Sequence, residues 1–202
     1  IGNIRVQQGK IDKAFEAYGL IIEQYPNYAD FDKLLGEMFS LAERLTREKS
    51  TKALGLWGYR DTDKAIDAFE KIVLAAPYSD YAPKALYTIA GLYRETDEEL
   101  SAIDAYERLL GSYPKSPLAA DAYLNAGDIY RGMVAGAPYD QGATNAAIRY
   151  YEDFVALYPD DERVTETKGK LAQMREVLAQ SKYNLALYYL EKRGNQAAAA
   201  SL

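Results

Sequence analysis

The sequence predicts an all-α fold in which helical hairpins stack side by side as a right-handed solenoid. Two observations lead to this prediction. A helical phrase with a small residue, an aromatic residue four positions later and a closing proline occurs four times in the 202 residues. Each later copy also follows another stretch with apolar residues at helical spacing, which can supply the partner helix that such a phrase needs.

The phrase is clearest in AIDAYERLLGSYP, from Ala102 to Pro114. The other copies place the same three residue types at Ala14, Tyr18 and Pro26, at Ala65, Phe69 and Pro77, and at Ala147, Tyr151 and Pro159. Residues at i and i+4 lie on one helix face, so the alanine lets a neighbouring helix approach while the aromatic ring fills the groove beside it. Proline then ends the helix. A fifth copy is expected to begin at about Ala198.

The partner helices carry a pattern of their own. The stretch before Ala102 has Leu86, Ile89, Ala90 and Tyr93 at helical spacing, and the stretch before Ala147 has Tyr123, Ala126, Gly127 and Tyr130. Together the two helices match the tetratricopeptide repeat (TPR) pattern, so we expect about four to five TPR hairpins in one superhelical domain over residues 1–202. Four unrelated amphipathic helices in a bundle are the alternative.

Residues 1–60 are expected to hold one repeat with an insertion. A turn at Gly9 precedes a helix over 11–25, and a second helix covers 28–47. Ala14 and Ala65 are 51 positions apart, against roughly 34 in a plain repeat. The surplus predicts an insertion at KSTKALGLWGYRDTD, in which Trp57 either folds back on the neighbouring helices or contacts a partner.

Two features are expected in the second half. The surplus between Ala102 and Ala147 lies in RGMVAGAPYDQGATN, which predicts a glycine-rich loop over 131–146. No proline interrupts residues 161–193, which predicts one very long helix, or two pieces with a break at Gly169. The first half of this helix should pack on the preceding repeats.

Composition excludes several classes of function. The 24 basic and 30 acidic residues give a net charge of −6 without a dense cationic cluster, so a nucleic-acid partner is not expected. No apolar run is long enough to span a membrane. The chain contains no histidine and no cysteine, and its acidic turn ETDEE lacks the ligand pattern of a calcium loop. We therefore expect no enzyme activity, no catalytic residue, no cofactor and no metal.

Tyrosine is abundant, with 19 residues. Most recur at positions of the repeat pattern, namely 18, 93, 106, 130, 151 and 189, so we expect these rings to be core residues and not ligand boxes.

The inner wall of a TPR solenoid is formed mainly by the first helix of each hairpin, and we expect a peptide-binding groove there. The residues that the pattern places on this wall are Lys84, Tyr87 and Arg94 from one repeat and Asp121, Leu124, Asp128 and Arg131 from the next. Tyr87 and Leu124 would supply apolar contacts, and Arg94 or Arg131 would hold a carboxylate or a carbonyl. Ordinary solvated helix faces with a few salt bridges are the alternative.

One TPR function can be set aside. The clamp that grips acidic chaperone tails needs lysine and asparagine at set positions of successive first helices. Here Glu37 follows Lys33 where asparagine is wanted, and Asp121 stands where a lysine is wanted.

Several segments resemble the BamD family, the TPR lipoproteins of the outer-membrane protein assembly machinery. They are the turns YPNYAD, APYSDYAP and YPKSPLAADAY, and above all REVLAQSKYNLALYYLEKRG from Arg175 to Gly194, with its pair Tyr188 and Tyr189. The resemblance covers residues 61–202, which implies that residues 1–60 are an extra repeat ahead of the family's usual start and that the family's last repeat is missing from the sequence. The chain begins at Ile1, within a repeat, so we expect a fragment whose secretion signal and lipid-acceptor cysteine would lie upstream.

The resemblance implies a periplasmic scaffold tethered to the outer membrane, which binds the barrel-forming subunit of the machinery and helps receive unfolded outer-membrane chains. Two rival binding modules stay open. The Tol-Pal coordinator family of YbgF shares the Tyr-Pro-x-Ser style of turn, and a generic cytosolic TPR adaptor is the other alternative.

Overall fold

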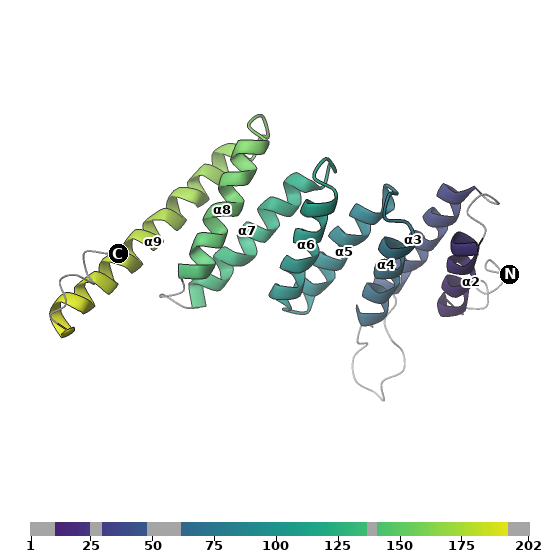
Figure 1. Cartoon of the computed structure of the whole chain (residues 1–202), viewed down its shortest axis with the longest axis horizontal. Helices are drawn as coiled ribbons and strands as arrows, with labels where there is room; N and C mark the ends of the chain where they lie inside the picture. Colours follow the sequence, from purple (N-terminus) through teal and green to yellow (C-terminus); the bar gives the residue numbers. More distant parts are fainter. Residues whose placement is uncertain (1–10, 25–29, 48–61, 137–140, 194–202) are drawn as a thin grey trace. The chain divides into compact units, whose positions relative to one another are not determined.

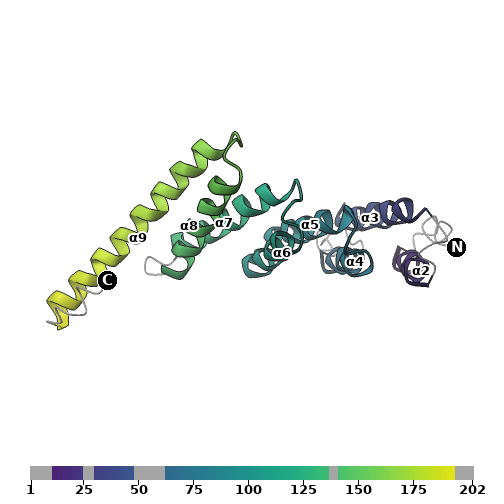
Figure 2. The same cartoon turned by 45° about the horizontal axis from the view of Figure 1, so that its top comes forward.

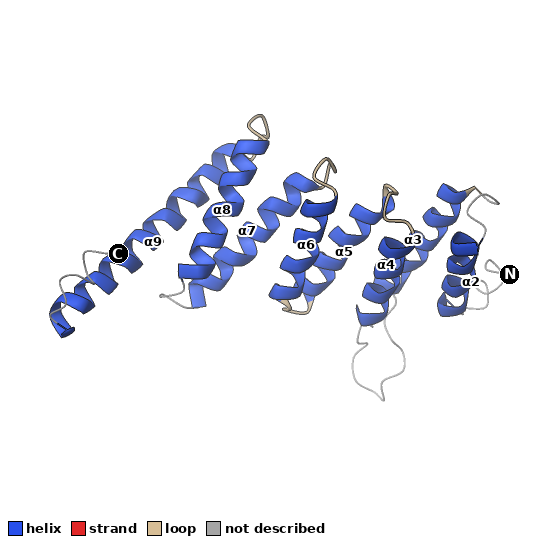
Figure 3. Cartoon of the chain, in the orientation of Figure 1, coloured by secondary structure: helices blue, strands red, loops and turns tan. Residues whose placement is uncertain are grey.

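A computed structural model describes residues 11–24, 30–47, 62–136 and 141–193, and all regular structure in these ranges is helical (Figures 1 and 3). The helices are α2 (Ile11–Gln24), α3 (Phe31–Arg47), α4 (Thr62–Ala75), α5 (Tyr81–Glu95), α6 (Glu99–Ser112), α7 (Ala119–Gly136), α8 (Gln141–Leu157) and α9 (Val164–Arg193). The predicted all-α TPR hairpins are confirmed, with boundaries close to the expected ones.

The chain divides into two compact units, Ile1–Leu118 and Ala119–Leu202. The first holds α2 to α6 and the second holds α7 to α9. Within each unit, every helix packs against the helix that follows it, as Figures 1 and 2 show from two directions. The expectations of one domain, of a right-handed superhelix and of a boundary near residue 60 remain predictions.

The repeated alanine–aromatic pairs form the buried seams of the hairpins. In each pair the alanine has no exposed surface and the ring is at most 5% exposed. The pairs are Ala14 with Tyr18, Ala65 with Phe69, Ala102 with Tyr106, and Ala147 with Tyr151. The helix face predicted from the phrase is therefore the buried face in all four copies.

Aromatic contacts join the seams in unit 1. The Phe39 ring of α3 meets Phe69 of α4 edge-on, with centroids 5.2 Å apart, and tilts against Tyr81 of α5 at 5.5 Å. Tyr87 of α5 meets Tyr106 of α6 edge-on at 5.7 Å. Such pairs add to the energy of apolar burial.

In unit 2, α9 is one continuous helix of 30 residues without a break at Gly169. Gly169 lies on an open face, where an added Cβ would meet no atom within 4 Å. The first half packs on the hairpin as expected, since Val164, Leu171 and Met174 are buried in a cluster with residues of α7 and α8. Farther along, Tyr183 is 59% exposed.

The predicted glycine-rich loop over 131–146 is wrong for most of its length. Helix α7 continues to Gly136 and α8 begins at Gln141, so most of the surplus residues lengthen the two helices. Burial explains the difference, because Val134 of α7 and Ala143 and Thr144 of α8 are buried and so extend the hairpin contact. Packing of this kind outweighs the low helix propensity of glycine.

Some expectations concern residues that the structure does not describe. The turn at Gly9, the insertion with Trp57, and the copy beginning at about Ala198 all lie outside the described ranges.

The tyrosines at pattern positions fall into two groups. Tyr18, Tyr106 and Tyr151 of the second helices are buried, as predicted for core rings. The prediction is only partly right for positions 93, 130 and 189, which are half-buried. These three belong to first helices, where the rings lie at the edge of a seam; Tyr130, for example, stacks on Tyr150 with centroids 5.7 Å apart.

We predict opposite effects for two alanine substitutions in unit 2. A Cβ at Gly127 of α7 would lie 2.7 Å from Cε1 of the buried Tyr151 ring, so Gly127→Ala should destabilise the unit by about 1–3 kcal/mol. Gly169→Ala is the matched control in open space and should stabilise α9 by up to about 1 kcal/mol. Urea titrations of both variants measure this difference. Equal effects would contradict the close approach of α7 and α8.

Candidate functional site

The seven residues expected on the inner wall lie on two first helices in different units. Lys84, Tyr87 and Arg94 are on α5 of unit 1. The other four are on α7 of unit 2. They therefore belong to two faces, the α5 face of unit 1 and the α7 face of unit 2.

The α5 face presents charge and one aromatic ring to solvent. Lys84 is exposed, and its Nζ lies 5.3 Å from the centroid of the Tyr81 ring one turn earlier, a cation–π distance. Tyr87 is half-buried, and its ring meets that of Tyr106 edge-on with centroids 5.7 Å apart. Arg94 is exposed near the end of the helix. These are the apolar and cationic residue types that the sequence analysis assigned to a peptide contact, and their role in binding stays a prediction.

The α7 face is organised around Asp128, which binds side chains of all three helices of unit 2. Its carboxylate accepts a hydrogen bond of 2.7 Å from the Tyr151 hydroxyl of α8. Lys170 Nζ of α9 donates to both carboxylate oxygens at 3.1 Å, and Arg131 Nε donates at 3.4 Å. These bonds tie α7 to α8 and α9 through one partly buried polar group.

The pKa values of this cluster follow from its contacts. Burial acts to raise the pKa of Asp128, but the hydrogen bonds from Tyr151 and Lys170 outweigh it and hold the pKa below its ordinary value. Burial, and then the bond to Asp128, raises the pKa of the Tyr151 hydroxyl. The carboxylate therefore stays ionised and the phenol stays protonated near neutral pH, so the cluster is a structural tie and not an acid–base pair.

Asp121 belongs to a second polar tie. Arg163, in the turn before α9, donates to Asp121 of α7 and makes two bonds to Asp161, at 2.8 and 2.7 Å. Its guanidinium carbon lies 5.6 Å from the centroid of the Phe154 ring. The side-chain and backbone hydrogen bonds from Arg163 lower the pKa of Asp161 to about 2.

The last residue of the α7 face is buried. Leu124 is 8% exposed and belongs to the core cluster of unit 2, where it has little surface left for a partner. Asp121 and Asp128 are engaged internally, so the expectation of salt-bridged helix faces describes α7 better than that of an open groove. Arg163 and Lys170 were missed from the sequence, because each meets its aspartate from 42 positions away and no local pattern signals this.

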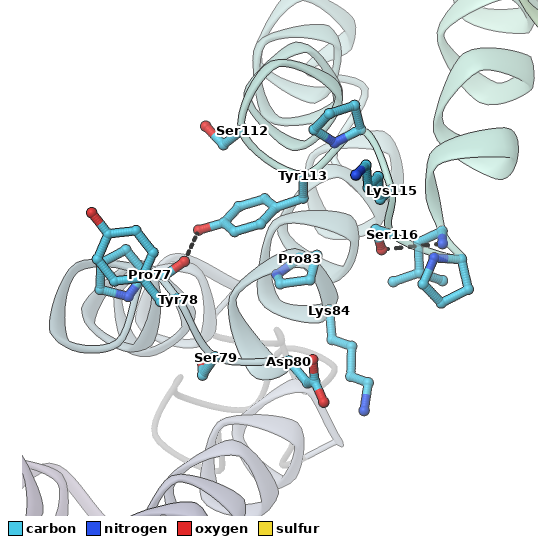
Figure 4. Close-up of a pocket in the computed structure, with 13 residues that line it drawn as sticks. Pro77, Tyr78, Ser79, Asp80, Pro83, Lys84, Ser112, Tyr113, Lys115 and Ser116 are labelled. Carbon is cyan, nitrogen blue, oxygen red and sulfur yellow. Dashed lines mark hydrogen bonds between the residues drawn. The ribbon is translucent and has the colours of Figure 1, made fainter. Parts of the chain in front are cut away.

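A pocket of about 740 Å³ lies in unit 1, between the α4–α5 turn and the α6–α7 turn (Figure 4). We call it the turn pocket. Its lining comes from residues 77–80, 83, 84 and 112–118. Tyr113 closes one side, because its hydroxyl donates a 2.6 Å hydrogen bond to the Pro77 carbonyl of the preceding repeat. Sequence reasoning singled out only Lys84 of this set as a binding residue.

The described ranges show neither a cluster of metal ligands nor a membrane-spanning helix. They contain no group of three or more acidic side chains placed to hold a metal ion. No helix among them combines the length and the apolar character needed to cross a bilayer.

The chain matches two sequence models of protein families. A sequence model of the YfiO family, described as "Outer membrane lipoprotein", matches residues 51–201, and a tetratricopeptide-repeat model matches residues 1–28. Two similar curated proteins are both named outer membrane protein assembly factor BamD. The protein of Caulobacter vibrioides is 26% identical over 137 residues, and that of Xylella fastidiosa is 23% identical over 142 residues.

The matches differ in how much of each chain they cover. The Caulobacter match covers 68% of this chain and 45% of the relative, and the Xylella match covers 65% and 48%. The chain thus spans about half the length of the curated relatives it matches. Among solved structures, a crystal structure of MamA aligns with a TM-score of 0.48 and 23% identity, over 98% of this chain and 91% of that chain.

Proposed function

This chain belongs to the YfiO family of outer membrane lipoproteins, and from that premise we propose that it is a non-enzymatic scaffold that binds protein partners in outer-membrane protein assembly. The observation that carries the proposal is the family match over residues 51–201, which includes every helix from α4 to α9. The BamD relatives, whose name states that role, support it.

The geometry of the helices fits a scaffold. Helical hairpins bury their alanine–aromatic seams and leave the first helices with a polar outer face. The α5 face, with Lys84, Tyr87 and Arg94, carries the accessible aromatic and cationic groups that anchor a polypeptide. We propose this face as the primary contact surface for a partner.

The place of action follows from the same premise. The family description as a lipoprotein supports a periplasmic protein held at the outer membrane by a lipid. The partners we propose are the barrel-forming subunit of the assembly machinery and unfolded outer-membrane chains. No observation favours a Tol-Pal role or a cytosolic adaptor.

A binding measurement with purified components tests this function. Biolayer interferometry of the chain against the soluble periplasmic part of the barrel-forming subunit from the same cell should give saturable binding. The periplasmic part of a Tol-Pal component, at the same concentration, is the control and should give none. Binding to the Tol-Pal component but not to the barrel-forming subunit would contradict the proposed function and support a Tol-Pal role.

We predict that reversing two cationic residues weakens this binding. The double variant Arg94→Glu with Arg131→Glu should lower the affinity for the barrel-forming subunit about tenfold, because truncation or reversal of a charged anchor costs well over 1 kcal/mol. Arg47→Glu, at the exposed end of α3 and outside the family match, should leave affinity unchanged.

Arg131 also donates a hydrogen bond of 3.4 Å to Asp128 within unit 2, so its reversal could disturb the fold. Circular dichroism of both variants checks that the helices are intact. With the helical signal intact, unchanged affinity of the double variant would remove these two arginines from the site.

A further inference from the structure

The turn pocket of unit 1 carries features that the scaffold role above does not use. We propose that it is a second binding site, which takes an extended acidic polypeptide segment bearing an aromatic side chain. The proposal goes beyond the partner contacts of the α5 face, although Lys84 borders both surfaces. The pocket volume of about 740 Å³ lies in the range typical of ligand sites and is large enough for a bulky side chain and its neighbours.

Hydrogen bonds hold the two turns that form the pocket walls. The hydrogen bond from Tyr113 to the Pro77 carbonyl fixes one turn to the other. In the α4–α5 turn the Ser79 hydroxyl donates to the Ala76 carbonyl at 2.8 Å, and in the α6–α7 turn the Leu118 amide donates to the Ser116 hydroxyl at 3.2 Å. Proline at four lining positions, 77, 83, 114 and 117, restricts the backbone further. A ligand therefore binds without the cost of ordering a loop.

The aromatic ring of Tyr78 lines the pocket and is not part of the hydrophobic core. Tyr78 is fully exposed, whereas the second-helix tyrosines of the repeat pattern are at most 5% exposed. Figure 4 shows its ring beside the contact between Tyr113 and Pro77. An exposed aromatic ring next to Pro77 offers a flat apolar surface for a ligand ring or an extended apolar segment.

The charge of the pocket selects an acidic ligand. Lys84 and Lys115 line it and are both exposed. Lys84 lies over the Tyr81 ring, and neither lysine forms an ion pair with an acid in the part of the chain that the structure describes. Asp80 is the one acid among the described lining residues. The lining thus carries two cations and one anion, in a chain whose net charge is −6. Lysines in this position attract and orient carboxylates of a partner.

A fluorescence anisotropy titration tests the proposal. The probe is a short fluorescein-labelled peptide in which one tryptophan is flanked by glutamates in a glycine–serine background. Its counterpart has lysines in place of the glutamates. The acidic probe should bind at least about tenfold more tightly than the basic one, a difference typical of an engaged charged anchor.

Substitutions then locate the binding. Tyr78→Ser and Lys115→Glu should each weaken the acidic probe about tenfold. The matched controls are Leu100→Ser, which removes a side chain 73% exposed, and Lys168→Glu, which reverses an exposed lysine of α9; both should leave the affinity unchanged. All four positions are exposed, so circular dichroism should report an unaltered fold.

Three results would overturn the proposal. The first is that the acidic and basic probes bind with equal affinity. The second is that neither Tyr78→Ser nor Lys115→Glu changes the affinity for the acidic probe. The third is that the chain binds no probe but associates with itself, and that Lys115→Glu abolishes this self-association. The third would show that a second copy of the chain occupies the pocket. The interferometry experiment can show no binding of the barrel-forming subunit without changing any of these probe results. Failure of one proposal is therefore distinguishable from failure of the other.

Discussion

Replacing Tyr151 by alanine is expected to lower the free energy of unfolding of unit 2 by about 3–5 kcal/mol, the cost of removing a large buried ring. The ring has no exposed surface and lies within the core cluster formed with Phe154, Leu171 and Met174. The same ring also contacts Gly127 of α7. Its loss therefore leaves a cavity at the junction of α7, α8 and α9. Hydrogen exchange of the backbone amides in these helices measures the effect.

Tyr151→Phe separates the ring from its hydroxyl. This variant keeps the packing but removes the hydrogen bond to Asp128, so we expect a loss of about 1.5–3 kcal/mol, the range for bonds to charged groups. If Tyr151→Ala and Tyr151→Phe destabilised unit 2 equally, the destabilisation by alanine would come from the lost hydroxyl and not from the lost ring. If neither changed exchange in α8, the buried seam would be misplaced.

The second large effect is expected at Arg163. Arg163→Leu should destabilise unit 2 by about 2–3 kcal/mol, because it removes charge-assisted bonds to Asp121 of α7 and to Asp161 and leaves two carboxylates without their cation. Arg175→Leu is the matched control. Its bond to Glu152 joins two more exposed side chains, so its loss should cost less than about 1 kcal/mol.

The pH dependence of Arg163→Leu follows from the sign of the Asp161 shift. The pKa of Asp161 is about 2 in the folded chain, below the ordinary value of about 3.9. Its pairing therefore stabilises the fold above the ordinary pKa, and this contribution disappears as the pH falls toward about 2. Urea titrations from pH 5 to pH 2 should show a steeper loss of stability in the parent chain than in Arg163→Leu. A parallel decline in the two proteins would contradict the tie.

Local spacing was enough to predict the hairpins and their seams. Alanine and an aromatic residue at i and i+4 must share a face, and the four pairs from Ala14 with Tyr18 to Ala147 with Tyr151 are all buried. The long helix to Arg193 followed from the absence of proline. Glycine misled the prediction between α7 and α8, because residues such as Val134 and Thr144 gain burial by staying helical.

The candidate faces were harder to predict, since their state depends on contacts between distant residues. The α7 pattern alone could not reveal that Asp128 meets Lys170 and Tyr151, or that Asp121 meets Arg163. The turn pocket likewise needs two turns brought together, with Tyr113 bonded to Pro77 from 36 positions away. Repeat patterns place residues on helices, whereas tertiary contacts decide which of them remain accessible.

Site-specific cross-linking in the native cell envelope tests the scaffold role most directly. A photo-reactive amino acid introduced at Tyr87 of the full-length protein lies on the α5 face, and after irradiation the captured protein is identified by mass spectrometry. We predict that the barrel-forming assembly subunit is captured, and that the same amino acid at Leu157, an exposed position of α8, captures much less of it. Capture of a Tol-Pal component at Tyr87, with no assembly subunit at either position, would contradict the proposed function.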